Sequence, residues 1–239
     1  MSAADVARVR ALVCDVFGTV VDWRGGVARA FEALGRAKGV AADWPALADE
    51  WRAGYQPAMQ RVRTGDLPWT NLDALHRMIL DPLLSRHGLD LSEAETQHLN
   101  TAWHRLDPWP DSVPGLTRLK RRFVIGTLSN GNVGLLVDMA KHGGLPWDVV
   151  FSAELVRHYK PDAETYRSTY ALLGLEPHEV MMVAAHTGDL EAARGYGLRT
   201  AFVARPREHG AGRPPAPVAP DAFDVVVGDF EALAQVMGA

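Results

Sequence analysis

Residues 11–19 read ALVCDVFGT. In this stretch a short apolar run leads to Asp15, and Gly18 and Thr19 follow it. A continuous run of this kind is typical of a parallel strand that is buried on both faces. Similar runs recur later in the chain, and stretches with helical periodicity separate them. Strands that alternate with helices predict an α/β fold with a doubly wound parallel sheet. The first run therefore predicts both the fold and a carboxylate at a strand end.

The remaining elements follow from the same periodicities. We expect strands at 11–17, 123–128, 149–151, 180–185, 200–203 and 225–227. We expect helices at 113–122, 132–143, 162–173, 189–195 and 229–237. The stretch 205–220 is rich in proline and lacks periodicity, so it predicts a surface loop.

The region between the first two strands predicts a helical insertion. Its apolar residues, such as Leu47, Trp51 and Tyr55, recur at intervals of three and four, as on amphipathic helices. We expect an α/β core domain over 1–20 and 106–239 and a helical cap domain over 21–105.

Composition and charge narrow the function classes. The chain has 239 residues, 47% of them hydrophobic, which suits a large globular domain with an insertion. Its net charge of -4 comes with scattered basic residues, so we expect no nucleic-acid partner. The N-terminal apolar run is too short for a signal peptide or a membrane span, which predicts a cytoplasmic protein without a membrane partner. Cys14, the only cysteine, allows no intrachain disulfide and is expected in the core.

Polar groups follow four of the expected strands. Asp15 follows the first, Ser129 and Asn130 the second, Lys160 the third, and His186 with Asp189 the fourth. Ligands of an open parallel sheet bind beyond the carboxyl ends of its strands. Each of these short motifs alone also fits ordinary turn or helix-start chemistry. Their order at successive strand ends points to one catalytic site.

These motifs resemble the haloacid dehalogenase superfamily over nearly the whole chain. The resemblance rests on Asp15-Val16-Phe17-Gly18-Thr19, Ser129-Asn130-Gly131, Lys160-Pro161 and Asp189, with a helical insertion after the first motif. It implies a Rossmann-like core with a cap domain, and a first aspartate that forms a covalent intermediate. Phosphatases of the family carry a second acid two residues after that aspartate, where this chain has Phe17. In those phosphatases the second acid is the general acid, and paired acids at the fourth motif help hold magnesium, where this chain has only Asp189. Magnesium needs hard oxygen ligands, so the two losses together favour metal-independent attack on carbon.

The closest resemblance is to the (S)-2-haloacid dehalogenases. Trp51-Arg52 in the cap and Lys160-Pro161 followed by Tyr166 match their motifs. The resemblance implies hydrolysis of a small (S)-2-haloacid to the 2-hydroxy acid through an ester on Asp15, without metal or cofactor. The implied catalytic residues are Asp15, Thr19, Lys160, Tyr166, His186 and Asp189, and the implied substrate-binding residues are Val16, Phe17, Arg52, Ser129 and Asn130.

The fourth motif departs from well-known members. It reads Ala184-Ala185-His186-Thr187-Gly188-Asp189, where those members have Ser-Ser-Asn-x-Trp-Asp. The role of His186 is therefore open between activating water, assisting halide departure and packing. Gly188 stands where those members have the Trp that helps form an apolar pocket for the halide. The halide pocket of this chain is therefore either more open or closed by another residue.

Two other functions stay open. One is a magnesium-dependent phosphatase-like hydrolase of the same fold, and the other is a non-catalytic binding protein that keeps the fold. A homodimer is also open. The histidines without a motif are expected on the surface: His76, His98, His142 and His158.

Overall fold

A computed structural model describes residues 8–239, so the first seven residues of the expected core domain lie outside it. Its centre is a six-stranded sheet in which every neighbouring pair is parallel. The strand order is β3-β2-β1-β4-β5-β6. The strands are β1 (Ala11–Cys14), β2 (Val124–Ser129), β3 (Val149–Ser152), β4 (Val180–Ala184), β5 (Arg199–Val203) and β6 (Val225–Val227). The predicted α/β fold with a doubly wound parallel sheet is confirmed.

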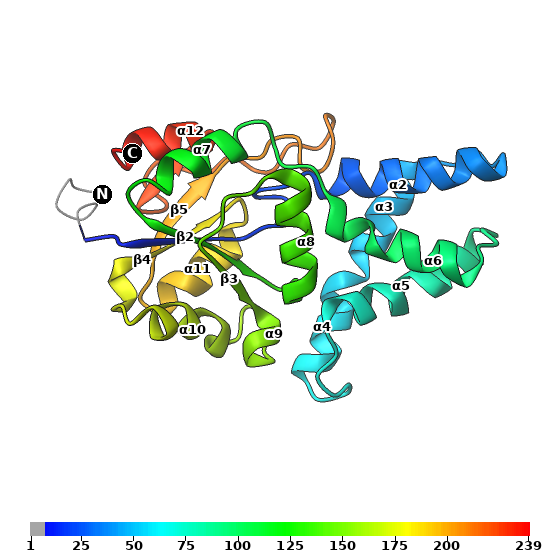
Figure 1. Cartoon of the computed structure of the whole chain (residues 1–239), viewed down its shortest axis with the longest axis horizontal. Coiled ribbons are helices and arrows are strands. Elements are labelled where there is room, and N and C mark those ends of the chain that lie inside the picture. The colour runs from blue at the N-terminus through cyan, green and yellow to red at the C-terminus, as the bar shows by residue number, and fades with distance from the viewer. Residues whose placement is uncertain (1–7) are drawn as a thin grey trace.

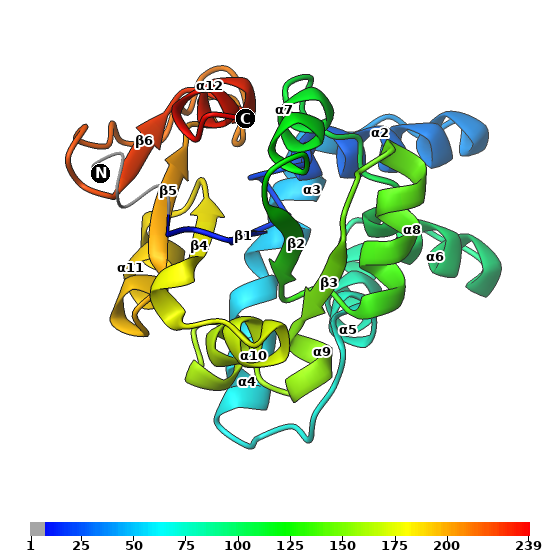
Figure 2. The same cartoon turned by 60° about the vertical axis from the view of Figure 1, so that its left-hand side comes forward.

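Helices cover both faces of the sheet because its strands are apolar on both faces (Figures 1 and 2). Leu12 and Cys14 of β1 pack in one hydrophobic cluster, while Ala11 and Val13 pack in the other. The first cluster includes α7 (Ser112–Leu119), α8 (Val133–Gly143) and α12 (Phe230–Val236). The second includes α10 (Ala163–Leu173) and α11 (Thr187–Gly195). The short α9 (Ala153–Val156) and η2 (Pro177–Glu179) complete this part.

All the elements between β1 and α7 are helices, and they extend to one side of the sheet (Figure 1). Their starts are encoded locally: Asp22 accepts a hydrogen bond from the Gly25 amide, and Ser92 forms a capping box with Glu95. We call this segment the helical insertion. It comprises α2 (Trp23–Lys38), α3 (Trp44–Ala53), α4 (Tyr55–Arg63), α5 (Leu72–Arg86), α6 (Glu93–Asn100) and η1 (Thr101–Arg105).

An aromatic cluster joins the insertion to the end of β1. The Trp103 ring lies 5.5 Å from that of Trp51 and 5.6 Å from that of Phe17, both edge to face. His76 stacks on Trp103 at 4.3 Å and is buried, so its expected surface position is wrong. It lies on the apolar face of α5, four residues from both Leu72 and Leu80. Burial and the nearby Arg52 charge hold its pKa well below the usual value, so His76 is neutral.

The turn after β1 creates the position of the site. β1 pairs with β2 on one side and with β4 on the other, so the chain reverses direction across the sheet at this strand. Such a switch point leaves a crevice beyond the strand ends. The chain turns sharply after Asp15: Gly18 adopts a positive φ of 89°, and the Val20 amide donates to the Val16 carbonyl. β1 therefore ends three residues earlier than expected.

Within residues 8–239, no helix is long and apolar enough to cross a membrane.

Candidate active site

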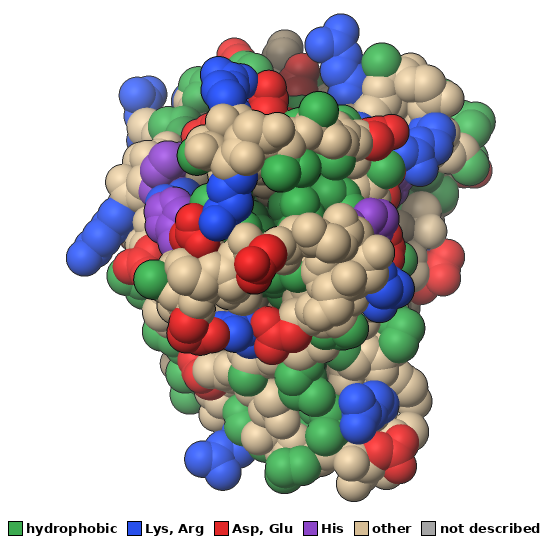
Figure 3. All heavy atoms as spheres, turned by 90° about the vertical axis from the view of Figure 1, so that its right-hand side faces the viewer, with side chains coloured by type: hydrophobic (Ala, Val, Ile, Leu, Met, Phe, Trp, Pro, Cys, Tyr) green, Lys and Arg blue, Asp and Glu red, His purple; other side chains and the backbone are tan. Residues whose placement is uncertain are grey.

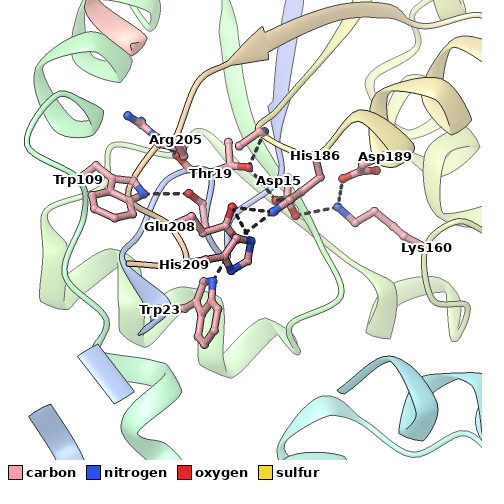
Figure 4. Close-up of polar contacts among 12 residues, drawn as sticks. Asp15, Thr19, Trp23, Trp109, Lys160, His186, Asp189, Arg205, Glu208 and His209 are labelled. Atoms are coloured by element: carbon pink, nitrogen blue, oxygen red, sulfur yellow. Dashed lines mark hydrogen bonds and ion pairs between the residues drawn. The ribbon is translucent and has the colours of Figure 1, made fainter. Parts of the chain in front are cut away.

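The structure brings the predicted strand-end groups together. Asp15 follows β1, Lys160 lies in the loop before α10, and His186 and Asp189 lie at the start of α11. Figure 4 shows these four side chains meeting beyond the carboxyl edge of the sheet. Residues far apart in the chain thus form one polar cluster.

Asp15 is held as an ionised carboxylate. Its Oδ1 accepts a hydrogen bond from Lys160 Nζ at 2.9 Å, and its Oδ2 accepts one from the Thr19 hydroxyl at 2.8 Å. His186 Nδ1 lies 3.1 Å from the same Oδ2. Burial alone would raise the pKa of Asp15, but the Lys160 charge and the hydrogen bonds from His186 and Lys160 outweigh it, so the pKa lies far below the usual value. A buried anion at this position is suited to nucleophilic attack.

Thr19 is oriented by the backbone. Its hydroxyl oxygen accepts a hydrogen bond from the Ala185 amide at 2.9 Å, which directs the hydroxyl proton toward Asp15. Thr19 is fully buried. It therefore fixes the orientation of the Asp15 carboxylate.

Lys160 bridges two carboxylates. Besides Asp15, its ammonium contacts Asp189, whose other oxygen accepts a hydrogen bond from the Tyr166 hydroxyl at 2.6 Å. Burial would lower the pKa of Lys160, yet the charges of Asp15 and Asp189 raise it, so the ammonium keeps its proton. Burial and the like charge of Asp15 raise the pKa of Asp189 despite Lys160. The Lys160 ammonium thus pairs with the carboxylates of both Asp15 and Asp189.

A cavity of about 420 Å³ opens over Asp15. Eight of the eleven predicted site residues line it: Asp15, Phe17, Arg52, Asn130, Lys160, Tyr166, His186 and Asp189. Val16, Thr19 and Ser129 are buried and do not line it. The Ser129 hydroxyl instead accepts a hydrogen bond from the Gly131 amide at 3.1 Å, so it shapes the turn after β2. The cavity is also lined by Tyr55, Gln56 and Pro161, which were not predicted as site residues, and by Gly188, which the fourth motif had placed at the halide pocket.

Arg52 reaches the cavity from α3 of the insertion. Its guanidinium carbon lies 4.0 Å from the centre of the Tyr55 ring and 5.4 Å from that of Trp23. Its Nη1 is buried and has no hydrogen-bond partner among residues 8–239. A guanidinium with an unused donor among aromatic rings is suited to binding an anion.

A second cavity, of about 210 Å³, lies at the far end of the insertion and is lined mainly by apolar residues such as Phe31, Leu34 and Trp44. Figure 3 looks onto this end of the molecule, where hydrophobic side chains show between charged ones. This cavity contains none of the predicted catalytic residues. The cavity over Asp15 is therefore the candidate active site.

Glu208 is a site residue that the sequence prediction missed. Its carboxylate lies 2.9 Å from His186 Nε2 and accepts a hydrogen bond from Trp23 Nε1 at 3.0 Å (Figure 4). Glu208 is only 4% exposed, so the prediction of a surface loop over 205–220 is wrong for this residue. The missed signal is its place just after β5, since the same strand-end rule identified Asp15.

His186 is held between two carboxylates. Burial alone would lower its pKa, but hydrogen bonds to Asp15 and Glu208 and their charges raise the pKa to about 10. Its side chain is still 36% exposed and lines the cavity. At neutral pH it is therefore an imidazolium that can face a bound molecule.

Comparison with known proteins identifies the family of the chain. A family model described as haloacid dehalogenase-like hydrolase matches residues 9–197. The (S)-2-haloacid dehalogenase 4A of Burkholderia cepacia is 30% identical over 203 residues, covering 84% of this chain and 85% of that protein. The (S)-2-haloacid dehalogenase of Pseudomonas sp. (strain YL) is 29% identical, covering 82% and 83%.

Solved structures with a similar fold include 2-haloacid dehalogenases. The defluorinating L-2-haloacid dehalogenase Rha0230 has a TM-score of 0.92 and 47% identity, covering 97% of this chain and 96% of that chain. The L-2-haloacid dehalogenase PA0810 has a TM-score of 0.93 and 46% identity, covering 96% and 99%. The enzyme of Xanthobacter autotrophicus with chloropropionic acid covalently bound has a TM-score of 0.81 and 25% identity, covering 97% and 99%.

Proposed function

Since the chain belongs to the haloacid dehalogenase-like hydrolases, we propose that it hydrolyses a small (S)-2-haloacid to the 2-hydroxy acid through an ester on Asp15. The observation that carries the proposal is an ionised, buried Asp15 that lines the same cavity as Arg52 of the helical insertion. Relatives named for this activity support it, as does the covalently bound chloropropionic acid in one of them.

In the first step an Asp15 oxygen attacks C2 of the substrate in line with the carbon–halogen bond. The halide leaves with the bonding electron pair, and the configuration at C2 inverts. Arg52 offers a cation with a free donor to the departing halide or to the substrate carboxylate. The backbone at Val16, Phe17 and Asn130 is the other proposed binding site for that carboxylate. The Ser129 hydroxyl does not reach the cavity and supports this site only through the turn after β2.

In the second step water attacks the carbonyl carbon of the Asp15 ester. Negative charge then develops on an Asp15 oxygen, where Lys160 already donates from 2.9 Å. Asp189 and Tyr166 hold Lys160 in place, and Thr19 holds the Asp15 side chain. The ester breaks at the carbonyl, and the 2-hydroxy acid leaves with the oxygen that came from Asp15.

The phosphatase alternative lacks support at the nucleophile. The residue two positions after Asp15 is Phe17, whose ring packs on Trp103 and supplies no acid or metal ligand. The space between Asp15 and Asp189 is occupied by the Lys160 ammonium. Both features favour attack on carbon without a metal.

The direct test is halide release from a panel of 2-haloacids, with each enantiomer assayed separately. Fluoroacetate belongs in the panel because a 47% identical structure is named a defluorinating enzyme. We expect halide and 2-hydroxy acid in equal amounts, with rates unchanged by a chelator or by added magnesium. Activity on a phosphate ester that requires magnesium, without halide release, would favour the phosphatase.

We also propose that residues 21–105 act as a cap domain on the core formed by 1–20 and 106–239. The cavity supports this division, since Arg52, Tyr55 and Gln56 come from the insertion and the acids from the sheet edge. A cytoplasmic location and a homodimer stay predictions.

A further inference from the structure

The loop that carries Glu208 is fixed to both parts of the molecule. Arg205 donates to both Asp111 oxygens at 2.8 Å and to the Thr19 carbonyl at 2.7 Å. Farther along, Arg213 pairs with Asp49 of α3. Between these points Glu208 contacts His186 and Trp23. Its carboxylate is therefore held in one position beside the active site.

We propose that Glu208 is a positioning residue that orients His186 so that His186 Nδ1 serves as the general base for hydrolysis of the Asp15 ester. This inference rests on the proposed function, because it concerns the second step of that reaction.

The geometry assigns different tasks to the two ring nitrogens. Nε2 lies 2.9 Å from Glu208, while Nδ1 lies 3.1 Å from Asp15 Oδ2. A carboxylate at Nε2 keeps a proton on that nitrogen, so the lone pair of the neutral ring is on Nδ1. Nδ1 is then the nitrogen beside the ester that water must attack.

The charges explain when the base becomes available. Asp15 and Glu208 are the charged groups in contact with the ring; Lys160 lies beyond Asp15, and His209 lies 3.9 Å from Glu208. While Asp15 is ionised, the imidazolium is favoured and is no base. Alkylation removes the Asp15 charge, so the pKa of His186 falls and Nδ1 releases its proton to solvent. The base therefore appears only after the ester has formed.

The protons then balance. Nδ1 takes a proton from water as its oxygen bonds to the Asp15 carbonyl carbon. The bond from that carbon to the substrate oxygen breaks, and the departing alkoxide takes the proton from Nδ1. The new Asp15 carboxylic acid loses its proton to Nδ1, which restores the imidazolium. The whole cycle consumes haloacid and water and yields hydroxy acid, halide and one proton.

Two variants separate the charge of Glu208 from its hydrogen bond. Glu208→Met has similar length but no acceptor, whereas Glu208→Gln keeps an acceptor and loses the charge. In single-turnover reactions, we expect Glu208→Met to alkylate Asp15 within about threefold of the wild-type rate and to hydrolyse the ester at least about tenfold more slowly. An adduct with the mass of the substrate minus halide should accumulate. Arg207→Gln, an exposed change in the same loop, should behave as wild type.

The pH profile of ester hydrolysis gives a readout that a merely structural role of Glu208 would not change. In Glu208→Gln the acid limb of ester hydrolysis should move to lower pH, because the lost negative charge lowers the pKa of His186. This profile also tests the proposal if Glu208→Met does not fold.

Three outcomes would overturn the inference. Ester hydrolysis at the wild-type rate in Glu208→Met is one, and equal slowing of alkylation and hydrolysis without an adduct is another. The third is an acid limb that does not move in Glu208→Gln. If the wild-type enzyme itself forms no ester and releases no halide, the proposed function fails instead.

Discussion

Asp15 owes its ionised state to its neighbours. Lys160, Thr19 and His186 donate to or contact its two oxygens, and together they keep it charged in a buried position. The sequence predicted this cluster because each member follows a strand or begins a helix at the same sheet edge. It did not predict how Thr19 and Ser129 differ, since both are buried hydroxyls and only their hydrogen bonds separate them.

Replacing Asp15 with asparagine tests the nucleophile. An amide has the same shape but lacks the negative charge, so we expect turnover to fall by at least about a thousandfold. The fold should persist, as measured by circular dichroism and thermal melting. Asp221→Asn, at an exposed position, should keep wild-type activity. Full halide release by Asp15→Asn, with mass spectrometry excluding reversion to aspartate, would rule out Asp15 as nucleophile.

His186 predicts a pH dependence of stability. Its pKa is raised from 6.5 to about 10 in the folded state, so protonation favours folding. That contribution is fully present below pH 6.5 and is lost as the pH rises toward 10. The wild type should therefore melt higher than His186→Gln near pH 6, and the gap should shrink by pH 10. A gap that stays constant or widens with pH would contradict the raised pKa.

At the scale of elements, the strands and helices of the sheet followed from periodicity, with ends shifted by a few residues. The loop after β5 did not, because proline-rich sequence without periodicity says little about burial. Arg205 and Glu208 are buried in it through contacts with groups far away in the chain. His76 was missed for a related reason: its helical face predicts burial, but its residue type favours the surface.

The anchor of this loop can be tested by stability. Arg205→Met should lower the free energy of unfolding by about 2 to 3 kcal/mol, because Asp111 would lose its paired charge in a largely buried place. Urea unfolding measures the change. Arg207→Met removes an exposed charge from the same loop and should stay within about 0.5 kcal/mol of wild type. Equal effects of the two substitutions would contradict the anchoring role.

At the scale of the whole molecule, residues from both parts of the chain line the candidate active site. The sheet edge supplies the acids and Lys160, and the insertion supplies Arg52 and its aromatic surroundings. The motifs of the sequence predicted both contributions. They did not predict that Tyr55 and Gln56 line the cavity, because side-chain orientation at a helix–sheet interface depends on packing across the whole interface.

The most direct test of the Asp15 ester is a single turnover in ¹⁸O-water with enzyme in excess of an (S)-2-haloacid. Water that attacks the Asp15 carbonyl leaves its oxygen on Asp15, and the product carries an oxygen that was already in the protein. We therefore predict one ¹⁸O atom in the peptide that contains Asp15 and an unlabelled hydroxyl in the 2-hydroxy acid, both read by mass spectrometry. Label in the product hydroxyl and none in the peptide would contradict the account, because water would then have attacked the substrate carbon directly.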